Sequence, residues 1–218
     1  DRAARSTSSR VIPMNRRLTL ATFNKALTIL THRDPDLGAV IAKFGKPPIW
    51  RRPRGFETLV LLILEQQVSL ASARAAYDRL AATAVELSPE KMLMLRDEEY
   101  RAAGVSRQKT RYIHHLSECL LDQSLRLDRL GRMGDDDVRA QLIQVKGIGA
   151  WTADVYLLMA LMRPDVWPVG DIALQAAAHG IKGLAARPDP AELTDIGEAW
   201  RPWRSVAARI LWHHYLST

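Results

Sequence analysis

Apolar residues recur three and four positions apart along most of the chain, and no segment alternates apolar and polar residues as a half-buried strand would. Helix start and stop signals divide this pattern into about ten short segments. Ser88 before Pro89, and Ser106 before a periodic run, are N-cap signals, whereas Gly45 and Gly104 end helices. The sequence therefore predicts an all-α fold.

Two further helix boundaries follow from the same signals. We expect Asp36 to cap a helix that ends at Gly45, and Asp171 to open a helix that Gly180 closes. Between the first of these helices and a strongly apolar helix that begins at Phe56, the basic and Pro-rich stretch KPPIWRRPRG predicts an irregular connection.

The composition suits a folded domain with a polyanionic partner. The chain has 218 residues, of which 47% are hydrophobic, so it can bury a core in one domain or in two packed subdomains. Its net charge of +7 favours nucleic acid first and an anionic membrane surface second. No apolar run approaches the ~20 residues of a membrane span, so we expect no membrane-embedded part.

The single cysteine, Cys119, excludes an intrachain disulfide and a zinc or iron–sulfur site held by several cysteines. We expect a cytoplasmic, nucleoid-associated protein in a bacterium, or a nuclear one in a eukaryote. The first residues, DRAARSTSSR, have no apolar core after them, so we interpret residues 1–19 as a flexible basic arm and not as a secretory signal.

A glycine pair separates two helical segments in VKGIGAWTADVYLL. Gly147 and Gly149 fit the turn of a helix-hairpin-helix motif, with one helix ending near Val145 and the next beginning near Ala150. Free N–H groups at the start of the second helix can then bind a phosphate of the DNA backbone without reading its sequence. An ordinary corner between two helices is the alternative interpretation.

Asp171 follows Gly147 by 24 positions, after the stretch WPVG. An isolated aspartate at the start of a helix is usually only an N-cap. Here the carboxylate occurs together with the glycine hairpin and with aromatic residues, and this combination points to a site.

The combination resembles the helix-hairpin-helix superfamily of DNA glycosylases, and within it the 3-methyladenine DNA glycosylase II branch. The resemblance is carried by four segments, LILEQQVSLASA, AGVSRQKTRYI, VKGIGAWTADVYLL with WPVGD, and WRPWRSVAARILW. It implies a compact form without the N-terminal β-domain of some members. It also implies two packed helical subdomains, residues 20–56 with 172–218 and residues 57–171, with the active-site cleft between them.

The resemblance further implies that the chain flips an alkylated purine, of the 3-methyladenine or 7-methylguanine type, out of double-stranded DNA and hydrolyses its N-glycosidic bond. Asp171 would stabilise the positive charge that develops on the sugar and orient the attacking water. Trp151 stands where bifunctional relatives carry a lysine nucleophile, so we expect a monofunctional enzyme that leaves an abasic site.

The resemblance also assigns a base pocket, formed by Trp151, Trp212, Val155 and Ile172. The two tryptophans would attract a cationic base through their ring faces. Val155 replaces a pocket tyrosine, and Ile172 replaces an aromatic residue beside the aspartate. Plain core packing is the alternative role for each tryptophan.

DNA contacts are expected from residues near the end of the apolar helix, from Lys109 and from the hairpin. Gln67 would fill the gap left by the flipped base, with Gln66 and Ser69 in support, and Lys109 would meet a phosphate. In the hairpin the expected contacts are Lys146, Gly147, Gly149 and Thr152. Alternatively, the two glutamines satisfy buried backbone groups and Lys109 is a solvated surface residue.

No catalytic cofactor and no iron–sulfur cluster are expected. In relatives, the hairpin carbonyls hold a monovalent cation, Na⁺ or K⁺, and the matching residues are Ile143, Val145 and Ile148. The expected partner is double-stranded DNA that contains alkylated bases, bound by a monomer. Two alternatives stay open, a non-catalytic DNA-binding module that uses only the hairpin and a glycosylase for oxidised or mismatched bases.

Overall fold

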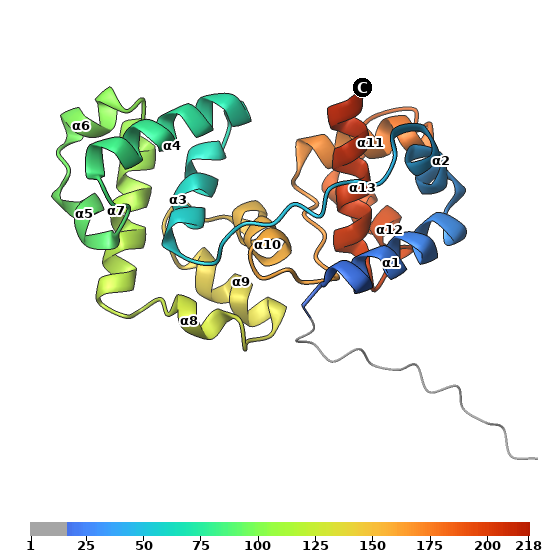
Figure 1. Ribbon diagram of the computed structural model, residues 1–218, viewed down its shortest axis with the longest axis horizontal. Coiled ribbons are helices and arrows are strands. Elements are labelled where there is room, and N and C mark those ends of the chain that lie inside the picture. The colour runs from blue at the N-terminus through green and yellow to red at the C-terminus, as the bar shows by residue number, and fades with distance from the viewer. Residues whose placement is uncertain (1–16) are drawn as a thin grey trace, which may run out of the picture.

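A computed structural model describes residues 17–218, and helices are the only regular elements within that range (Figure 1). The all-α prediction is confirmed, and the described residues contain more helices than the ten or so expected. The helices are α1 (Leu20–Arg33), α2 (Pro35–Phe44), α3 (Phe56–Glu65), α4 (Leu70–Ala84), α5 (Pro89–Met94), α6 (Asp97–Ala102), α7 (Arg107–Leu121), α8 (Leu127–Leu130), α9 (Asp135–Ile143), α10 (Ala150–Met159), α11 (Ile172–Lys182), α12 (Pro190–Glu198) and α13 (Arg204–Ser217).

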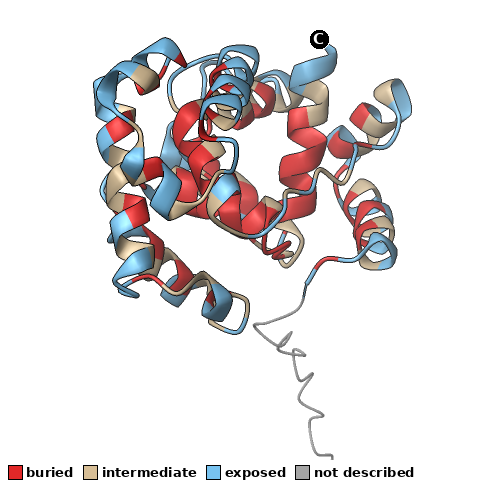
Figure 2. Cartoon of the chain, turned by 60° about the vertical axis from the view of Figure 1, so that its left-hand side comes forward, coloured by how far each residue is buried: buried red, intermediate tan, exposed pale blue. Residues whose placement is uncertain are grey.

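The helices pack in two groups that lie side by side in Figure 1. In one group, α13 contacts α1, α2 and α11, and α12 packs on α11. In the other, α3 packs on α4, α7 and α10. Helix α7 also packs on the short helices α5 and α6, and α10 packs on α9. Helix α10 is apolar on almost every side, which is why it is buried over most of its length (Figure 2). Helix α13 is buried from Ser205 to Trp212, a stretch that includes the polar residues Ser205 and Arg209.

Two predicted helix boundaries are wrong by a few residues. The cap of α2 is Asp34, whose side chain accepts the N–H of Asp36, so Asp36 lies in the first turn. Helix α11 runs past Gly180 and ends at Gly183, which has the left-handed backbone (φ 59°) typical of a helix C-cap. In each case a second residue of the same capping type stood nearby in the sequence.

The connection between α2 and α3 is irregular, as predicted, and is held in place by a buried arginine. Arg209 of α13 is fully buried and donates to the carbonyls of Ile49 (2.7 Å) and Trp50 (3.2 Å) in the connection, and of Leu158 (3.0 Å) in α10. Burial lowers the pKa of Arg209, and these carbonyls replace the water that its guanidinium loses. One side chain thus joins α10, α13 and the connection.

The predicted N-terminal arm falls mostly outside the described residues, which begin at Arg17. Residues 17–19 instead belong to the folded part, because Leu18 is 2% exposed, its N–H bonds to the Met162 carbonyl at 2.6 Å, and Thr19 caps α1. In residues 17–218, no helix is both long enough and apolar enough to cross a membrane.

A buried polar cluster ties the start of α2, the end of α11 and the segment between α12 and α13 together. Asp34 accepts from Nζ of Lys182 (2.7 Å) and from Nε1 of Trp200 (2.7 Å). Burial acts to raise the pKa of Asp34, but the hydrogen bonds from Lys182 and Trp200 outweigh it and hold the pKa below its ordinary value of 3.8. The folded state therefore favours the ionised carboxylate.

This cluster predicts a pH-dependent loss of stability. A carboxylate with a depressed folded-state pKa contributes stability that is complete above its unfolded pKa and is lost as the pH falls through the folded value. We expect Asp34→Asn to lower the free energy of unfolding by about 2 kcal/mol at pH 7, the scale of a charge-assisted hydrogen bond, and by less below about pH 4. Urea unfolding at several pH values measures this difference.

Asp36→Asn is the matched control, because Asp36 bonds to the same lysine at 2.8 Å but is exposed. Its loss should cost less than about 1 kcal/mol. A difference between wild type and Asp34→Asn that stays constant from pH 7 to pH 3 would contradict the account.

Candidate active site and DNA-binding hairpin

The glycine pair forms a tight hairpin between α9, which ends at Ile143, and α10, which begins at Ala150. Gly147 has φ +90°, and a Cβ placed on it would lie 2.1–2.5 Å from the ring of Tyr112, so conformation and space both require glycine there. Gly149 is the N-cap of α10 with φ −96°, and a Cβ on it would meet nothing within 4 Å. Its small size instead leaves the start of α10 open.

The N-terminus of α10 carries no side-chain cap within residues 17–218. The first N–H groups of a helix have no partner inside the helix and carry the positive end of its dipole. Lys146 and Gly149, beside this end, are exposed. The predicted hairpin residues thus form an open, positively polarised surface, whereas the side chain of Thr152 is buried and faces inward.

Side chains from two other helices hold the hairpin in shape. Gln66, which ends α3, donates from Nε2 to the Gly147 carbonyl (2.8 Å) and to Oγ1 of Thr152 (3.0 Å). From α7, the ring of Tyr112 covers Gly147, and Nδ1 of His115 accepts the N–H of Lys146 at 3.0 Å. For Gln66, the geometry matches the alternative in which it satisfies backbone groups. Sequence reasoning missed Tyr112 and His115, since no local pattern shows which hairpin a helix covers.

Asp171 is held by donors from three helices. As the N-cap of α11 it accepts the N–H of Leu174 at Oδ1 (2.9 Å), and the same oxygen accepts Nε1 of Trp212 in α13 (3.1 Å). Oδ2 accepts Nε1 of Trp151 in α10 (2.8 Å). A carboxylate has about four lone-pair sites. Three donors therefore fix the group and leave acceptor capacity on Oδ2.

Asp171 differs from the other buried aspartates because no basic side chain pairs with it. Asp34 is paired with Lys182, and Asp154 of α10 is paired with Arg139 at 2.6 Å. Within residues 17–218, no lysine, arginine or histidine forms an ion pair with Asp171, although it is only 8% exposed. A buried carboxylate without a cation is costly unless it is hydrogen-bonded, and such a group is free to stabilise a cation that arrives.

The four predicted pocket residues differ in how far they are buried. Trp151 is half-buried, Trp212 and Val155 are buried, and Ile172, the first residue of α11, is 65% exposed. Both tryptophans turn their N–H edges to Asp171. Tyr156, the neighbour of Val155, is not near the carboxylate, because its hydroxyl accepts the N–H of Gly55 at 3.0 Å.

The turn between α3 and α4 projects from the surface. Gln67 is exposed and has a left-handed backbone (φ 57°), an unusual conformation for a residue with a side chain. Ser69 caps α4 by accepting the N–H of Ser72, and the apolar residues Val68 and Leu70 on either side are exposed. The turn is therefore a protruding element with an apolar surface beside Gln66 and the hairpin.

Lys109 holds the C-terminal end of α3, just before this turn. Its Nζ donates to the carbonyl of Leu64, near the C-terminal end of α3, at 2.7 Å, and burial lowers its pKa. A cation at a helix C-terminus satisfies carbonyls that have no partner in the helix. Neither predicted role describes this contact, since Lys109 is half-buried and engaged by the protein.

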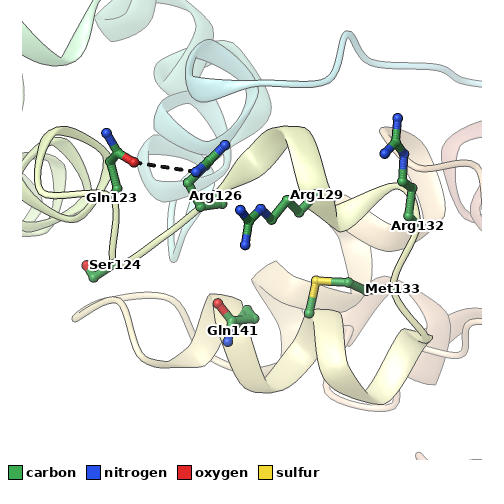
Figure 3. A pocket seen from close by; sticks show the side chains of 7 residues that line it. All are labelled: Gln123, Ser124, Arg126, Arg129, Arg132, Met133 and Gln141. Carbon is green, nitrogen blue, oxygen red and sulfur yellow. Dashed lines mark hydrogen bonds between the residues drawn. The ribbon is translucent and has the colours of Figure 1, made fainter.

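A separate cavity of about 520 Å³ lies between the end of α7, α8 and α9 (Figure 3). Arg126 in it already bonds to Asp128 at 3.0 Å and to Gln123 at 3.4 Å. None of the predicted site residues lines this cavity, which is formed by Gln123, Ser124, Arg126, Arg129, Arg132, Met133 and Gln141. It contains no carboxylate and is not the base pocket.

Residues 60–202 match the model of the HhH-GPD superfamily base excision DNA repair protein. The chain belongs to this family. The family assignment agrees with the expected glycosylase superfamily and with the all-α fold.

Individual HhH-GPD relatives carry repair names. The chain is 37% identical over 196 residues to a protein of Mycobacterium tuberculosis named probable bifunctional transcriptional activator/DNA repair enzyme AlkA, with 82% of this chain and 37% of that protein covered. It is 27% identical to the putative DNA-3-methyladenine glycosylase YfjP of Bacillus subtilis, with 81% of this chain and 64% of that protein covered. The chain thus spans less than two thirds of the length of these relatives.

Solved HhH-GPD structures resemble the fold closely. A DNA-3-methyladenine glycosidase from Bacillus halodurans is 33% identical with a TM-score of 0.73, and the match covers 86% of this chain and 87% of that one. The 3-methyladenine DNA glycosylase Mag1 of Schizosaccharomyces pombe, solved with abasic DNA, has a TM-score of 0.77 at 24% identity and covers 86% of this chain and 95% of that one. The second likeness concerns the fold alone.

The hairpin geometry predicts different consequences for its two glycines. Gly147→Ala places a Cβ inside the Tyr112 ring at a strained φ, so we expect the free energy of unfolding to fall by about 2 kcal/mol or more. Gly149→Ala should cost less than about 1 kcal/mol, because the position is open and its φ is ordinary. Chemical denaturation of both variants measures the difference, and equal losses would show that Tyr112 does not confine Gly147.

Proposed function

We propose that this HhH-GPD protein is a DNA glycosylase that hydrolyses the N-glycosidic bond of an alkylated purine in double-stranded DNA. The observation that carries the proposal is Asp171, a buried carboxylate that is fixed by three donors and has no basic partner among residues 17–218. The names of the relatives support the same reaction class. We propose that the chain binds duplex DNA as a monomer.

The chemistry requires a negative group beside the sugar. As the bond from C1′ to the damaged base breaks, positive charge develops on the sugar ring, and a fixed carboxylate stabilises that charge without having to reorganise. The acceptor capacity left on Oδ2 of Asp171 suits a water molecule that attacks C1′ and whose proton Asp171 can accept. In this role Asp171 is the catalytic residue.

The damaged base must leave the helical stack to reach this group. We propose that Trp151, Trp212, Val155 and Ile172 line its pocket. The indole N–H edges already bond to Asp171, so the ring faces are the surfaces left for the base, and an electron-rich face attracts an alkylated, cationic purine. Ile172 is the exposed member and would form the mouth of the pocket.

We propose that the hairpin binds the DNA backbone and does not read the base sequence. We propose that the amides at the start of α10, between Gly147 and Thr152, bind a phosphate, with Lys146 adding charge. Gln67, held out on its strained turn, would occupy the space that the flipped nucleotide leaves. Gln66 and Ser69 stabilise that turn and the hairpin, and Lys109 supports the end of α3.

A monovalent cation fits the hairpin chemically. The carbonyls of Ile143, Val145 and Ile148 are hard oxygen donors of the kind that such ions accept. The Val145 carbonyl also accepts the N–H of Ile148 at 2.9 Å, so it would share its oxygen between both. When bound, the ion would add positive charge to the hairpin, and the cleavage chemistry would remain with Asp171.

Asp171→Asn tests the proposal. The variant keeps an N-cap and its size but loses the charge, so we expect release of 7-methylguanine from methylated duplex DNA to fall by at least about 10³-fold, while DNA affinity changes little. Released base is quantified by chromatography. Asp189→Asn, which alters the matching N-cap of α12, is the control and should keep full activity. Equal release by wild type and Asp171→Asn would remove Asp171 from the reaction.

The product separates a monofunctional enzyme from a glycosylase that also cuts the strand. Trp151 has no amine for a Schiff base, so we expect the DNA strand to stay intact after base release until alkali is added. Denaturing electrophoresis with and without alkali measures this, and a strand cut by the purified enzyme alone would contradict the assignment.

A further inference from the structure

We infer that His115 is a positioning residue that sets the conformation of the hairpin through the N–H of Lys146. The inference rests on the proposed function, in which the hairpin binds the DNA backbone. His115 lies on α7, outside every predicted site, and neither DNA nor substrate need touch it.

The contact is built by one face of α7. Tyr112 and His115 are three positions apart, so their side chains emerge on the same side of the helix. The Tyr112 ring covers Gly147 and is held by a hydrogen bond from Gln108, one turn earlier. One turn of α7 thus contacts two successive hairpin residues, Lys146 and Gly147, by ring packing and by a hydrogen bond.

The hydrogen bond fixes the chemical state of the imidazole. The N–H of Lys146 points at Nδ1 of His115 at 3.0 Å, so Nδ1 must be an acceptor and the ring proton must be on Nε2. The hydrogen bond thus ties Lys146 to α7, at the residue before Gly147, whose φ is +90°.

Two groups besides the hairpin face His115. The thiol of Cys119 lies 3.8 Å from Nδ1 and 4.0 Å from Nε2, and Asp122, one turn further on, interacts with the imidazole through its charge. Neither replaces the N–H of Lys146 as a partner for Nδ1.

Three variants test the inference. In His115→Asn, Oδ1 occupies the topological position of Nδ1 and can still accept the N–H, but it cannot be protonated. His115→Phe keeps the ring and has no acceptor. His114→Phe is the matched control, because His114 packs against Tyr100 at 5.3 Å on the other side of α7. Affinity is measured for a duplex that contains tetrahydrofuran, a stable abasic analogue, so no base release is needed.

We expect His115→Phe to bind about three- to tenfold more weakly, the effect of one lost hydrogen bond, and His115→Asn and His114→Phe to bind like wild type at pH 8. Equal affinities of all variants would overturn the inference.

A second readout needs no DNA. The backbone amide of Lys146 should exchange with solvent more slowly in wild type and His115→Asn than in His115→Phe, as measured by NMR. If wild type fails to bind the duplex or to release base, the proposed function fails. The exchange rate of the Lys146 amide still shows whether His115 positions the hairpin. Equal exchange in all three proteins would overturn the positioning role.

Discussion

Three N–H donors converge on one carboxylate, and the arrangement of the whole fold is needed to bring them together. The donors to Asp171 come from its own helix α11, from Trp151 in α10 and from Trp212 in α13, which are 20 and 41 positions away in the sequence. Because the three helices must meet at one point, the packing of α10 and α13 around Arg209, and of α11 on α13, has a chemical consequence. It holds a negative group in a buried place without a neutralising cation.

Helix α10 couples this carboxylate to the proposed DNA-binding surface. Its first turn presents open amides next to Gly149, and Trp151, its second residue, donates to Asp171. In the proposed function, the separation between a bound phosphate and the reacting sugar would be set by a single helical turn, which is far stiffer than a loop. Gln66 and residues of α7 hold the hairpin before this turn, so the geometry of the proposed phosphate site would depend on them as well.

Local signals allowed the sequence to predict most of the helices, the hairpin and the N-cap at Asp171. Caps, prolines and glycines act on their own neighbours, so boundaries with competing residues, such as Asp34 beside Asp36, were misplaced. The contacts of Tyr112, His115 and Lys109 could not be predicted, because each joins helices far apart in the sequence. The donors to Asp171 were expected as pocket walls, and the direction of their N–H edges follows only from the packing of α10 and α13.

The most direct test of the central claim compares two abasic analogues that differ in charge. A pyrrolidine ring in the DNA is cationic at neutral pH and mimics the charge that develops on the sugar, whereas tetrahydrofuran is neutral. If Asp171 faces that position as an unpaired anion, wild type should bind the pyrrolidine duplex about tenfold or more tightly than the tetrahydrofuran duplex, and Asp171→Asn should lose this preference. An equal preference in both proteins would show that the charge beside the sugar is not that of Asp171.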